Sequence, residues 1–282
     1  MSKVLVIAGP TASGKTALAI DLAQKLNGEI VSADSMQIYR RMDVGTAKAT
    51  AEEQAAVPHH MIDIVEPWEN YSVSRYVEDA AKCCEDILSR EKLPVICGGT
   101  GLYTDSLLSG RNFGDSPEGS ELRDELNAKY DSAGGEAMLK ELSVFDPERA
   151  AKLAPNDKKR IVRAFEVYLL TGETITEHDE KTRLLPPRYE AEFRILGTGD
   201  RAALYQRIDA RVDSMMEKGL VAEVEELLKT VSPEATSMQA IGYKEIASYL
   251  RGELSLDEAV ELIKQSSRRY AKRQLTWFRK YI

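Results

Sequence analysis

The stretch "GPTASGKT" at residues 9–16 decides the fold, because it fits the GxxxxGK[ST] pattern of a phosphate-binding loop. Such a loop points several backbone N–H groups at one anion. Gly9 and Gly14 supply backbone angles that residues with a side chain avoid. The Lys15 ammonium is expected against the terminal phosphates, and the Thr16 hydroxyl is expected to bind Mg²⁺.

The segments on either side of this loop fit the same interpretation. Residues 3–8 form an apolar run typical of a buried parallel strand. Leu18, Leu22 and Leu26 recur at every fourth position, which predicts an apolar stripe on a helix that follows the loop. The positive end of that helix adds to the attraction for an anion. Strand, loop and helix in this order therefore predict a phosphate site.

Composition places the chain among ordinary cytosolic globular proteins. Its 282 residues are 43% hydrophobic and 30% charged, and the net charge of -8 argues against a surface devoted entirely to nucleic acid. Cys83, Cys84 and Cys97 show no CxxC spacing, which suits a reducing cytoplasm. No signal peptide or apolar run of membrane-spanning length is present, so we expect a cytoplasmic protein with no membrane partner.

Alternating strands and helices predict an α/β fold. Strands are expected at residues 28–34 and 93–99 with a helix at 72–90 between them, which is the pattern of a parallel sheet flanked by helices. From 113 to 190 helical patterns follow one another without a strand, and a last strand is expected at 192–199 before further helices. We therefore predict a P-loop catalytic domain, 1–112 with 191–282, and an inserted all-helical domain, 113–190.

The ends of the strands carry the candidate chemistry, since ligands of parallel sheets bind at the carboxyl edge. The strand at 93–99 ends in "CGGTGLY", without the Asp that usually holds Mg²⁺ in an NTPase. Asp34 and Gln37 follow the second strand near the mouth of the phosphate loop. By local chemistry alone Asp34 is a metal ligand, a general base or the N-cap of the next turn. The adjacent His59 and His60 are interpreted as packing or loop residues rather than as a metal site.

Seven blocks spread over residues 3–279 resemble the bacterial tRNA dimethylallyltransferases, also called tRNA isopentenyltransferases. In the family's order they are "GPTASGKT", "DSMQIYRRMDVGTAK", "VPHHMID", "GGTGLY", "NDKKRIVRAFEVY", "QAIGYKE" and "YAKRQLTWFR". The resemblance implies transfer of a five-carbon dimethylallyl group from its diphosphate to N6 of the adenosine 3′-adjacent to the anticodon in tRNA. Pyrophosphate is released in this reaction, so the loop would hold a leaving group and phosphorus would not be attacked.

The resemblance also assigns roles to residues. Asp34 would act as the general base on the poorly nucleophilic exocyclic amine, Thr100 would lie near that amine, and Arg211 would contact the diphosphate. A side-chain amide both donates and accepts, so Gln37 would read the adenine edge. Mg²⁺ would sit on Thr16. The expected diphosphate-binding residues are Gly9, Thr11, Ala12, Ser13, Gly14, Lys15 and Thr16.

Contacts to the tRNA anticodon stem-loop are expected from several segments. Lys159, Arg160 and Arg163 form the basic face of one inserted helix, and Arg123 matches a family residue that contacts tRNA. Arg123 and Arg211 are equally interpretable as surface ion-pair partners. The loop at 239–244 is assigned through the resemblance alone. The expected tRNA-binding residues are Asp34, Ser35, Met36, Gln37, Thr100, Arg123, Lys159, Arg160, Arg163, Gln239, Gly242, Tyr243 and Lys244.

The segment 264–280 is rich in Lys and Arg and has no acidic residue, so its basic face either binds RNA or pairs with acidic side chains elsewhere. Ile263, Tyr270 and Trp277 repeat at an interval of seven, which favours packing in the core over stacking on bases. Two alternatives to the tRNA enzyme are an isopentenyltransferase acting on adenine nucleotides and a P-loop small-molecule kinase. The helical insertion favours tRNA as the acceptor, and a single-site enzyme of this size is expected to act as a monomer.

Overall fold

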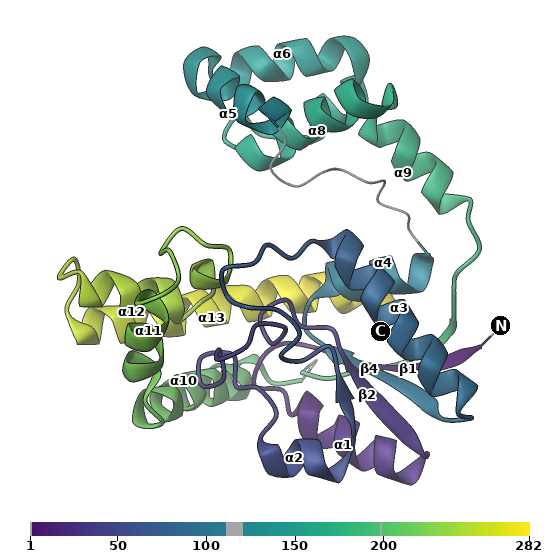
Figure 1. The fold of residues 1–282 in the computed structure, drawn as a ribbon, viewed down its shortest axis with the longest axis vertical. Coiled ribbons are helices and arrows are strands. Elements are labelled where there is room, and N and C mark those ends of the chain that lie inside the picture. Colours follow the sequence, from purple (N-terminus) through teal and green to yellow (C-terminus); the bar gives the residue numbers. More distant parts are fainter. Residues whose placement is uncertain (1, 111–120, 198) are drawn as a thin grey trace. The chain divides into compact units, whose positions relative to one another are not determined.

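The computed structural model describes residues 2–110, 121–197 and 199–282 (Figure 1). The chain divides into two compact units, one formed by residues 1–108 and 188–282 and the other by residues 109–187. The second border lies near the predicted position at 190, and the predicted border at 112 falls outside the described residues. None of the described helices is long and apolar enough to cross a membrane.

A five-stranded parallel sheet forms the centre of the first unit, as the sequence predicts. The strand order is β3-β2-β4-β1-β5, and every pair in it is parallel. The two-residue strand β3 was not predicted. The bounds are β1 Lys3–Ala8, β2 Gly28–Ser32, β3 His59–His60, β4 Leu93–Gly98 and β5 Glu190–Ile195.

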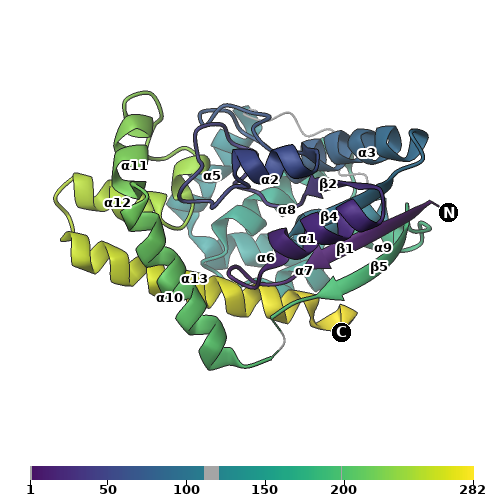
Figure 2. The same cartoon turned by 90° about the horizontal axis from the view of Figure 1, so that it is seen from below.

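Helix α1 (Lys15–Lys25) covers one face of this sheet. Its small residues Ala19 and Ala23 are fully buried against alternate strand residues, among them Ile7 and Val95. Successive side chains of a strand point to opposite faces, so the neighbouring strand residues are buried on the other side. The short helix α2 (Ala51–Ala56), which the sequence did not predict, lies on the same side as α1 (Figure 2).

Helices α3 (Val73–Ser89) and α4 (Gly101–Ser109) cover the opposite face. The Ser72 side chain caps α3 by accepting a hydrogen bond from the backbone N–H of Arg75 at 3.2 Å. Tyr76 of α3 stacks on Tyr103 of α4 with ring centroids 3.9 Å apart. The strand predicted at 93–99 is β4, which ends at Gly98, and the rest of "GGTGLY" turns into α4.

Four further helices belong to the first unit (Figure 2). Helices α10 and α12 pack against the longest of them, α13, and α11 packs against α12 and α10. Ile263 of α13 is buried, but Trp277 is 42% exposed, so the predicted core position is wrong for Trp277. Its indole Nε1 instead donates to Asp105 Oδ2 of α4 at 2.9 Å. The bounds are α10 Arg201–Glu217, α11 Leu220–Leu228, α12 Tyr243–Leu250 and α13 Leu256–Phe278, with 3-10 turns at Ser237–Gln239 and Arg279–Tyr281.

The basic segment that includes α13 forms ion pairs within its own unit. Lys264 pairs with Asp213 at 2.7 Å, Arg268 with Asp209 at 2.5 Å and Lys280 with Asp105 at 2.6 Å. Of the two alternatives left open by the sequence, pairing with acidic side chains therefore accounts for these three cations.

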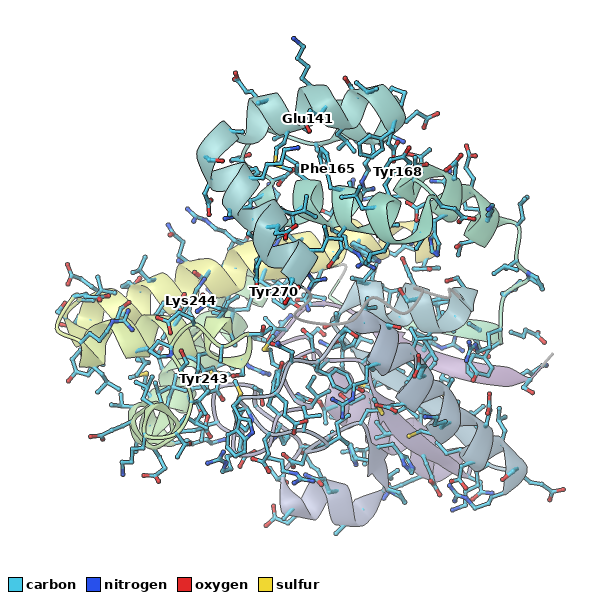
Figure 3. The ribbon with its side chains drawn as sticks, turned by 45° about the horizontal axis from the view of Figure 1, so that its top comes forward. Glu141, Phe165, Tyr168, Tyr243, Lys244 and Tyr270 are labelled. Atoms are coloured by element: carbon cyan, nitrogen blue, oxygen red, sulfur yellow. The ribbon has the colours of Figure 1, made fainter. Side chains whose placement is uncertain are left out.

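The second unit is entirely helical in its described residues. Its core gathers buried apolar side chains from α5, α6 and α8, including Leu126, Leu142 and Phe165. Tyr168 stacks on Phe145 with ring centroids 4.2 Å apart, and Figure 3 shows Tyr168 beside Phe165 on α8. Helix α9 was not predicted. The bounds are α5 Glu121–Ala133, α6 Gly135–Phe145, α7 Pro147–Lys152, α8 Lys158–Thr171 and α9 Ile175–Arg183.

Candidate active site

The phosphate loop joins β1 to α1 in the geometry that its glycines predict. Gly9 has a φ of 149°, and a Cβ there would lie 2.6 Å from the Leu196 carbonyl oxygen. Gly14, with a φ of 85°, is the N-cap of α1. The Pro10 carbonyl accepts a hydrogen bond from the Lys15 ammonium at 2.6 Å. The loop is therefore held in a compact turn at the carboxyl end of β1.

A cavity of about 360 Å³ opens at this edge of the sheet, entirely within the first unit. Residues from the loop, from the ends of β2 and β4, from α10, from the segment around 240 and from α13 line it. Ten of the predicted site residues are among them: Thr11, Lys15, Thr16, Asp34, Ser35, Met36, Gln37, Arg211, Gln239 and Lys244. The structure thus brings segments far apart in the sequence to one place.

The remaining predicted residues of this unit do not line the cavity. Four of them, Gly9, Ala12, Ser13 and Gly14, belong to the phosphate loop but do not reach the cavity surface. Thr100 lies one step away, where its Oγ1 accepts a hydrogen bond from the backbone N–H of Ser35 at 3.1 Å.

Positive charge dominates the cavity. Among the described residues, four cationic side chains and one carboxylate line it: Lys15, Arg211, Lys244, Arg273 and Asp34. Lys15 as a whole residue is half-buried, but its ammonium group is enclosed, and this burial lowers its pKa to about 8. Burial also lowers the pKa of Arg211, and the nearby Asp34 carboxylate partly opposes this. Two enclosed cations beside a phosphate loop are suited to an anion with several charges.

Asp34 lines the same cavity, close enough to Lys15 and Arg211 to interact with both charges, and one of its oxygens is bound to the backbone. Its Oδ1 accepts a hydrogen bond from the N–H of Met36 at 2.9 Å, so the local capping role is present in the structure. Within the described part of the chain, its Oδ2 has no hydrogen-bond partner. That oxygen is therefore able to accept a proton or a hydrogen bond from a ligand. No group of three or more His, Cys, Asp or Glu among the described residues is arranged to hold a metal ion.

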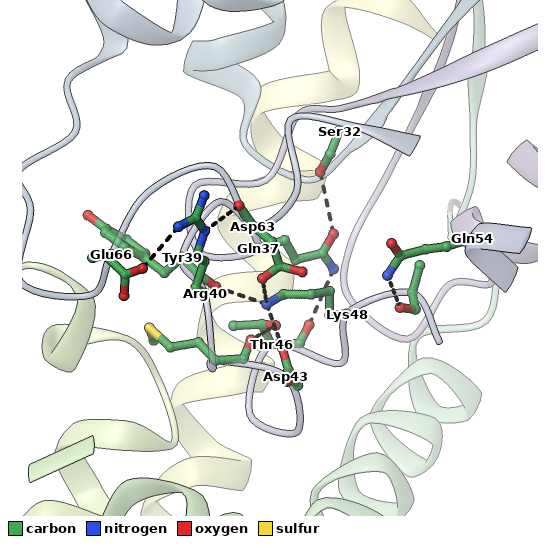
Figure 4. A network of polar contacts seen from close by, with 12 residues as sticks. Ser32, Gln37, Tyr39, Arg40, Asp43, Thr46, Lys48, Gln54, Asp63 and Glu66 are labelled. Atoms are coloured by element: carbon green, nitrogen blue, oxygen red, sulfur yellow. Dashed lines mark hydrogen bonds and ion pairs between the residues drawn. The ribbon is translucent and has the colours of Figure 1, made fainter. Parts of the chain in front are cut away.

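Gln37 is part of a polar network (Figure 4). Its Nε2 faces the carbonyl oxygens of Thr46 and Ala47, each at 3.4 Å, and its Oε1 accepts from the Ser32 hydroxyl at 3.4 Å. The Thr46 carbonyl also accepts from the Arg211 guanidinium at 3.2 Å. One backbone oxygen therefore contacts both predicted ligand-binding side chains.

Helix α13 supplies cavity residues that the sequence analysis missed. Tyr270 lines the cavity although a core position was predicted for it, and burial raises its pKa to about 12. Gln274 is 5% exposed; its Oε1 accepts from the N–H of Thr11 and its Nε2 donates to the Gly99 carbonyl, both at 3.0 Å. The heptad spacing indicated the helix, but no local signal showed that it returns to the phosphate loop.

The segment 239–244 is divided between the cavity and the interior. Gln239 and Lys244 line the cavity, whereas Gly242 begins α12 with a φ of 99°. The Tyr243 side chain is fully buried, and its hydroxyl donates to Glu223 at 2.6 Å. The structure therefore gives the Tyr243 side chain a packing role instead of the predicted contact with RNA. Figure 3 shows Lys244 beside Tyr243, with Tyr270 on α13.

The predicted basic residues of the second unit form ion pairs and an exposed patch. Arg123 binds both oxygens of the buried Glu166 at 2.9 and 2.8 Å, and Arg163 binds the same carboxylate at 2.8 Å. The ion-pair alternative for Arg123 is thus present in the structure. Lys159 and Arg160 are exposed on the same helix as Arg163.

His59 and His60, set aside as packing or loop residues, form β3. His59 Nδ1 lies 2.8 Å from the Val57 carbonyl, and His60 Nε2 lies 2.8 Å from the buried Glu29 carboxylate. Arg90 and Lys92 bind the same carboxylate. Of the cysteines, Cys84 is fully buried, as expected for a small core residue, and Cys97 lines the cavity.

Fold and cavity define a class of protein: a P-loop α/β protein with a cationic cavity next to one carboxylate. Comparison with family models narrows this class. The family described as IPP transferase matches residues 37–281, and one described as isopentenyl transferase matches residues 2–63. The chain belongs to the IPP transferase family.

Relatives and solved structures agree with this assignment. The tRNA dimethylallyltransferase of Acetivibrio thermocellus is 52% identical over 99% of this chain and 90% of its own. A crystal structure of the tRNA isopentenylpyrophosphate transferase of Bacillus halodurans is 43% identical, with a TM-score of 0.72 over 99% of this chain and 87% of that one. A eukaryotic dimethylallyltransferase, studied acting on tRNA, is 32% identical with a TM-score of 0.85 over 99% of this chain and 70% of that one.

Proposed function

We propose that this protein transfers a dimethylallyl group from dimethylallyl diphosphate to N6 of the adenosine 3′-adjacent to the anticodon in tRNA. The observation that supports this most is the content of one cavity. Lys15 and Arg211 suit a diphosphate, and the Asp34 carboxylate with the Gln37 amide suits an adenine amine. The relatives named as tRNA dimethylallyltransferases support the same substrates.

Bond breaking in this reaction occurs between the allylic carbon and the diphosphate oxygen. Negative charge grows on the departing pyrophosphate, and the loop N–H groups, Lys15 and Arg211 stabilise it. Removing one such preorganised donor typically costs about 3 kcal/mol of transition-state stabilisation. The carbon left electron-poor accepts the lone pair of N6, which forms the new C–N bond.

Proton transfer completes the step. The N6 amine is a weak nucleophile because its lone pair is delocalised into the ring, and it must lose a proton as the C–N bond forms. The free Oδ2 of Asp34 accepts this proton, while its Oδ1 stays bound to the N–H of Met36. Gln37 orients the adenine by donating to and accepting from its edge, and Thr100 supports this side of the pocket through Ser35.

Mg²⁺ fits the Thr16 position in our proposal. Thr16 lines the cavity at the first turn of α1, and its hydroxyl is the protein oxygen that this loop pattern offers to Mg²⁺. Mg²⁺ is usually held by few protein groups together with phosphate oxygens and water, which agrees with the absence of a cluster of acidic ligands among the described residues. When bound, the ion would neutralise part of the charge on the leaving group.

Recognition of the tRNA is assigned to exposed positively charged groups. Lys159 and Arg160 of the second unit and Lys244 at the cavity are suited to the phosphate backbone. Arg163 is added as part of the same basic helix face, and Arg123 is added by the resemblance. The accepting base lies in a loop, from which it can be unstacked and drawn into a pocket. We also propose that the protein acts in the cytoplasm and as a monomer, since a single-site enzyme of this size can act alone.

Incubation with labelled dimethylallyl diphosphate, in parallel with unmodified tRNA, AMP and ATP, tests the proposal. We expect label in tRNA alone, and digestion of that tRNA is expected to place it on N6 of the adenosine after the anticodon. Label in AMP or ATP would instead identify an adenine-nucleotide isopentenyltransferase. Phosphate transfer from ATP without any use of the allylic diphosphate would identify a kinase.

A further inference from the structure

The loop formed by residues 43–47, here called the 43–47 loop, builds one wall of the cavity. Gly45, Thr46 and Ala47 line the cavity, and the Thr46 carbonyl contacts both Gln37 and Arg211. The position of this backbone therefore sets where two predicted ligand-binding side chains lie. The groups that hold the 43–47 loop in place then act on the reaction through it.

Glu223, on the first turn of α11, binds this loop through its backbone. Its Oε2 accepts hydrogen bonds from the N–H groups of Asp43 at 2.9 Å and Val44 at 2.8 Å, and its Oε1 accepts from Gly45 at 3.1 Å. Three successive backbone N–H groups converging on one carboxylate form the kind of concave anion site that peptide backbones build. Glu223 and the Asp43 N–H that it binds are 180 residues apart in the sequence.

Tyr243 completes this arrangement. Its hydroxyl donates to Glu223 Oε1 at 2.6 Å, and its ring lies against Gly45, where a Cβ would be only 2.4 Å from the ring. Both oxygens of Glu223 are thus fully used by four donors. The Glu223 carboxylate binds the backbone of the 43–47 loop and the Tyr243 ring packs against it, so the loop has little freedom to shift.

We propose that Glu223 is a positioning residue for the transfer reaction. Through the 43–47 loop it keeps the Thr46 carbonyl where it orients the Arg211 guanidinium toward the diphosphate and the Gln37 amide toward the adenine. This inference rests on the proposed function. The effect of Glu223 on Arg211, however, concerns anion binding and is testable without the transfer reaction.

Replacement by glutamine tests the carboxylate itself. Glu223→Gln keeps the size of the side chain but replaces one acceptor oxygen by an NH₂ group, which then faces donors. We expect inorganic pyrophosphate to bind about 5- to 20-fold more weakly, and kcat/KM for transfer to tRNA to fall about 10- to 100-fold, because a shift of about 1 Å at a reacting group has an effect of this size. Glu226→Gln, on the same helix, is the matched control; Glu226 forms an exposed ion pair with Lys229, and both values should stay within about twofold.

A double-mutant cycle separates positioning from a general loss of structure. In an Arg211→Ala background, Glu223→Gln is expected to weaken pyrophosphate binding less than about twofold, because the group through which it acts is gone. An equal loss in both backgrounds would overturn the proposal, as would wild-type binding and transfer in the single variant. If Glu223→Gln does not fold, as judged by its melting curve, Glu223→Asp keeps the charge with a shorter side chain and is used in the same cycle. A wild-type protein that transfers no label to tRNA would refute the proposed function, while the pyrophosphate cycle would still decide the role of Glu223.

Discussion

Burial of the Lys15 ammonium makes anion binding depend on pH in a defined direction. Its pKa in the free protein is lowered from 10.5 to about 8. Only the charged form attracts a diphosphate, and a bound diphosphate restores the charge by stabilising it. Affinity should therefore be nearly constant below about pH 8 and fall about tenfold for each further pH unit, as binding comes to require uptake of a proton.

The size of the effect follows from the protonated fraction. With a pKa of about 8, this fraction falls from roughly 0.9 near pH 7 to roughly 0.03 near pH 9.5, a change of about 30-fold. We expect a decrease of this size in the affinity for inorganic pyrophosphate, measured by titration calorimetry at fixed Mg²⁺ concentration.

Pyrophosphate also changes its protonation state with pH, and a reference variant corrects for this effect. Lys15→Met lacks the titrating group, so the ratio of wild-type to variant affinity isolates the lysine. A ratio that stays constant between about pH 7 and pH 9.5 would show that Lys15 is charged throughout, and the argument from its burial would be refuted. A ratio that rises with pH would contradict the predicted direction of the effect as well.

Three further predictions concern single side chains. Asp34→Asn should leave pyrophosphate and tRNA affinities within a few-fold and slow single-turnover transfer about 10²-fold or more; wild-type turnover would remove Asp34 as the base. Gly99→Ala should weaken pyrophosphate binding several-fold, because its Cβ would lie 2.0 Å from Gln274 Nε2, whereas Gly199→Ala, with no atom within 4 Å, should bind normally in the same titration. Glu166→Ala should destabilise the second unit by about 2 to 4 kcal/mol, measured by hydrogen exchange in α8 of the full chain; unchanged protection there would contradict a structural role for this carboxylate.

The sequence predicted those parts of the site that local patterns define. The phosphate loop and Asp34 were found because a glycine spacing, an apolar strand and the carboxyl edge of a sheet can all be recognised within a few residues. Arg211 was found through the resemblance, since "RIDARVD" by itself does not show which side chain faces the cavity.

Residues whose role depends on distant partners were missed or misplaced. Gln274 contacts Thr11 across 263 residues of sequence, and nothing near either residue indicates this contact. Trp277 follows the heptad of the buried Ile263, yet it lies at the surface, because the end of α13 is held by Asp105. Tyr243 was assigned to RNA, but its ring is buried against Gly45. The spacing of apolar residues predicts which face of a helix is buried, but it does not predict which segment that face packs against.

The two hydrogen bonds of Gln274 have a consequence for synthesis of the protein. The phosphate loop leaves the ribosome long before Gln274, the side chain that joins its Thr11 N–H to the Gly99 carbonyl, because Thr11 and Gln274 are 263 residues apart. A nascent chain that lacks α13 has the nucleotide-type motif without one wall of its pocket.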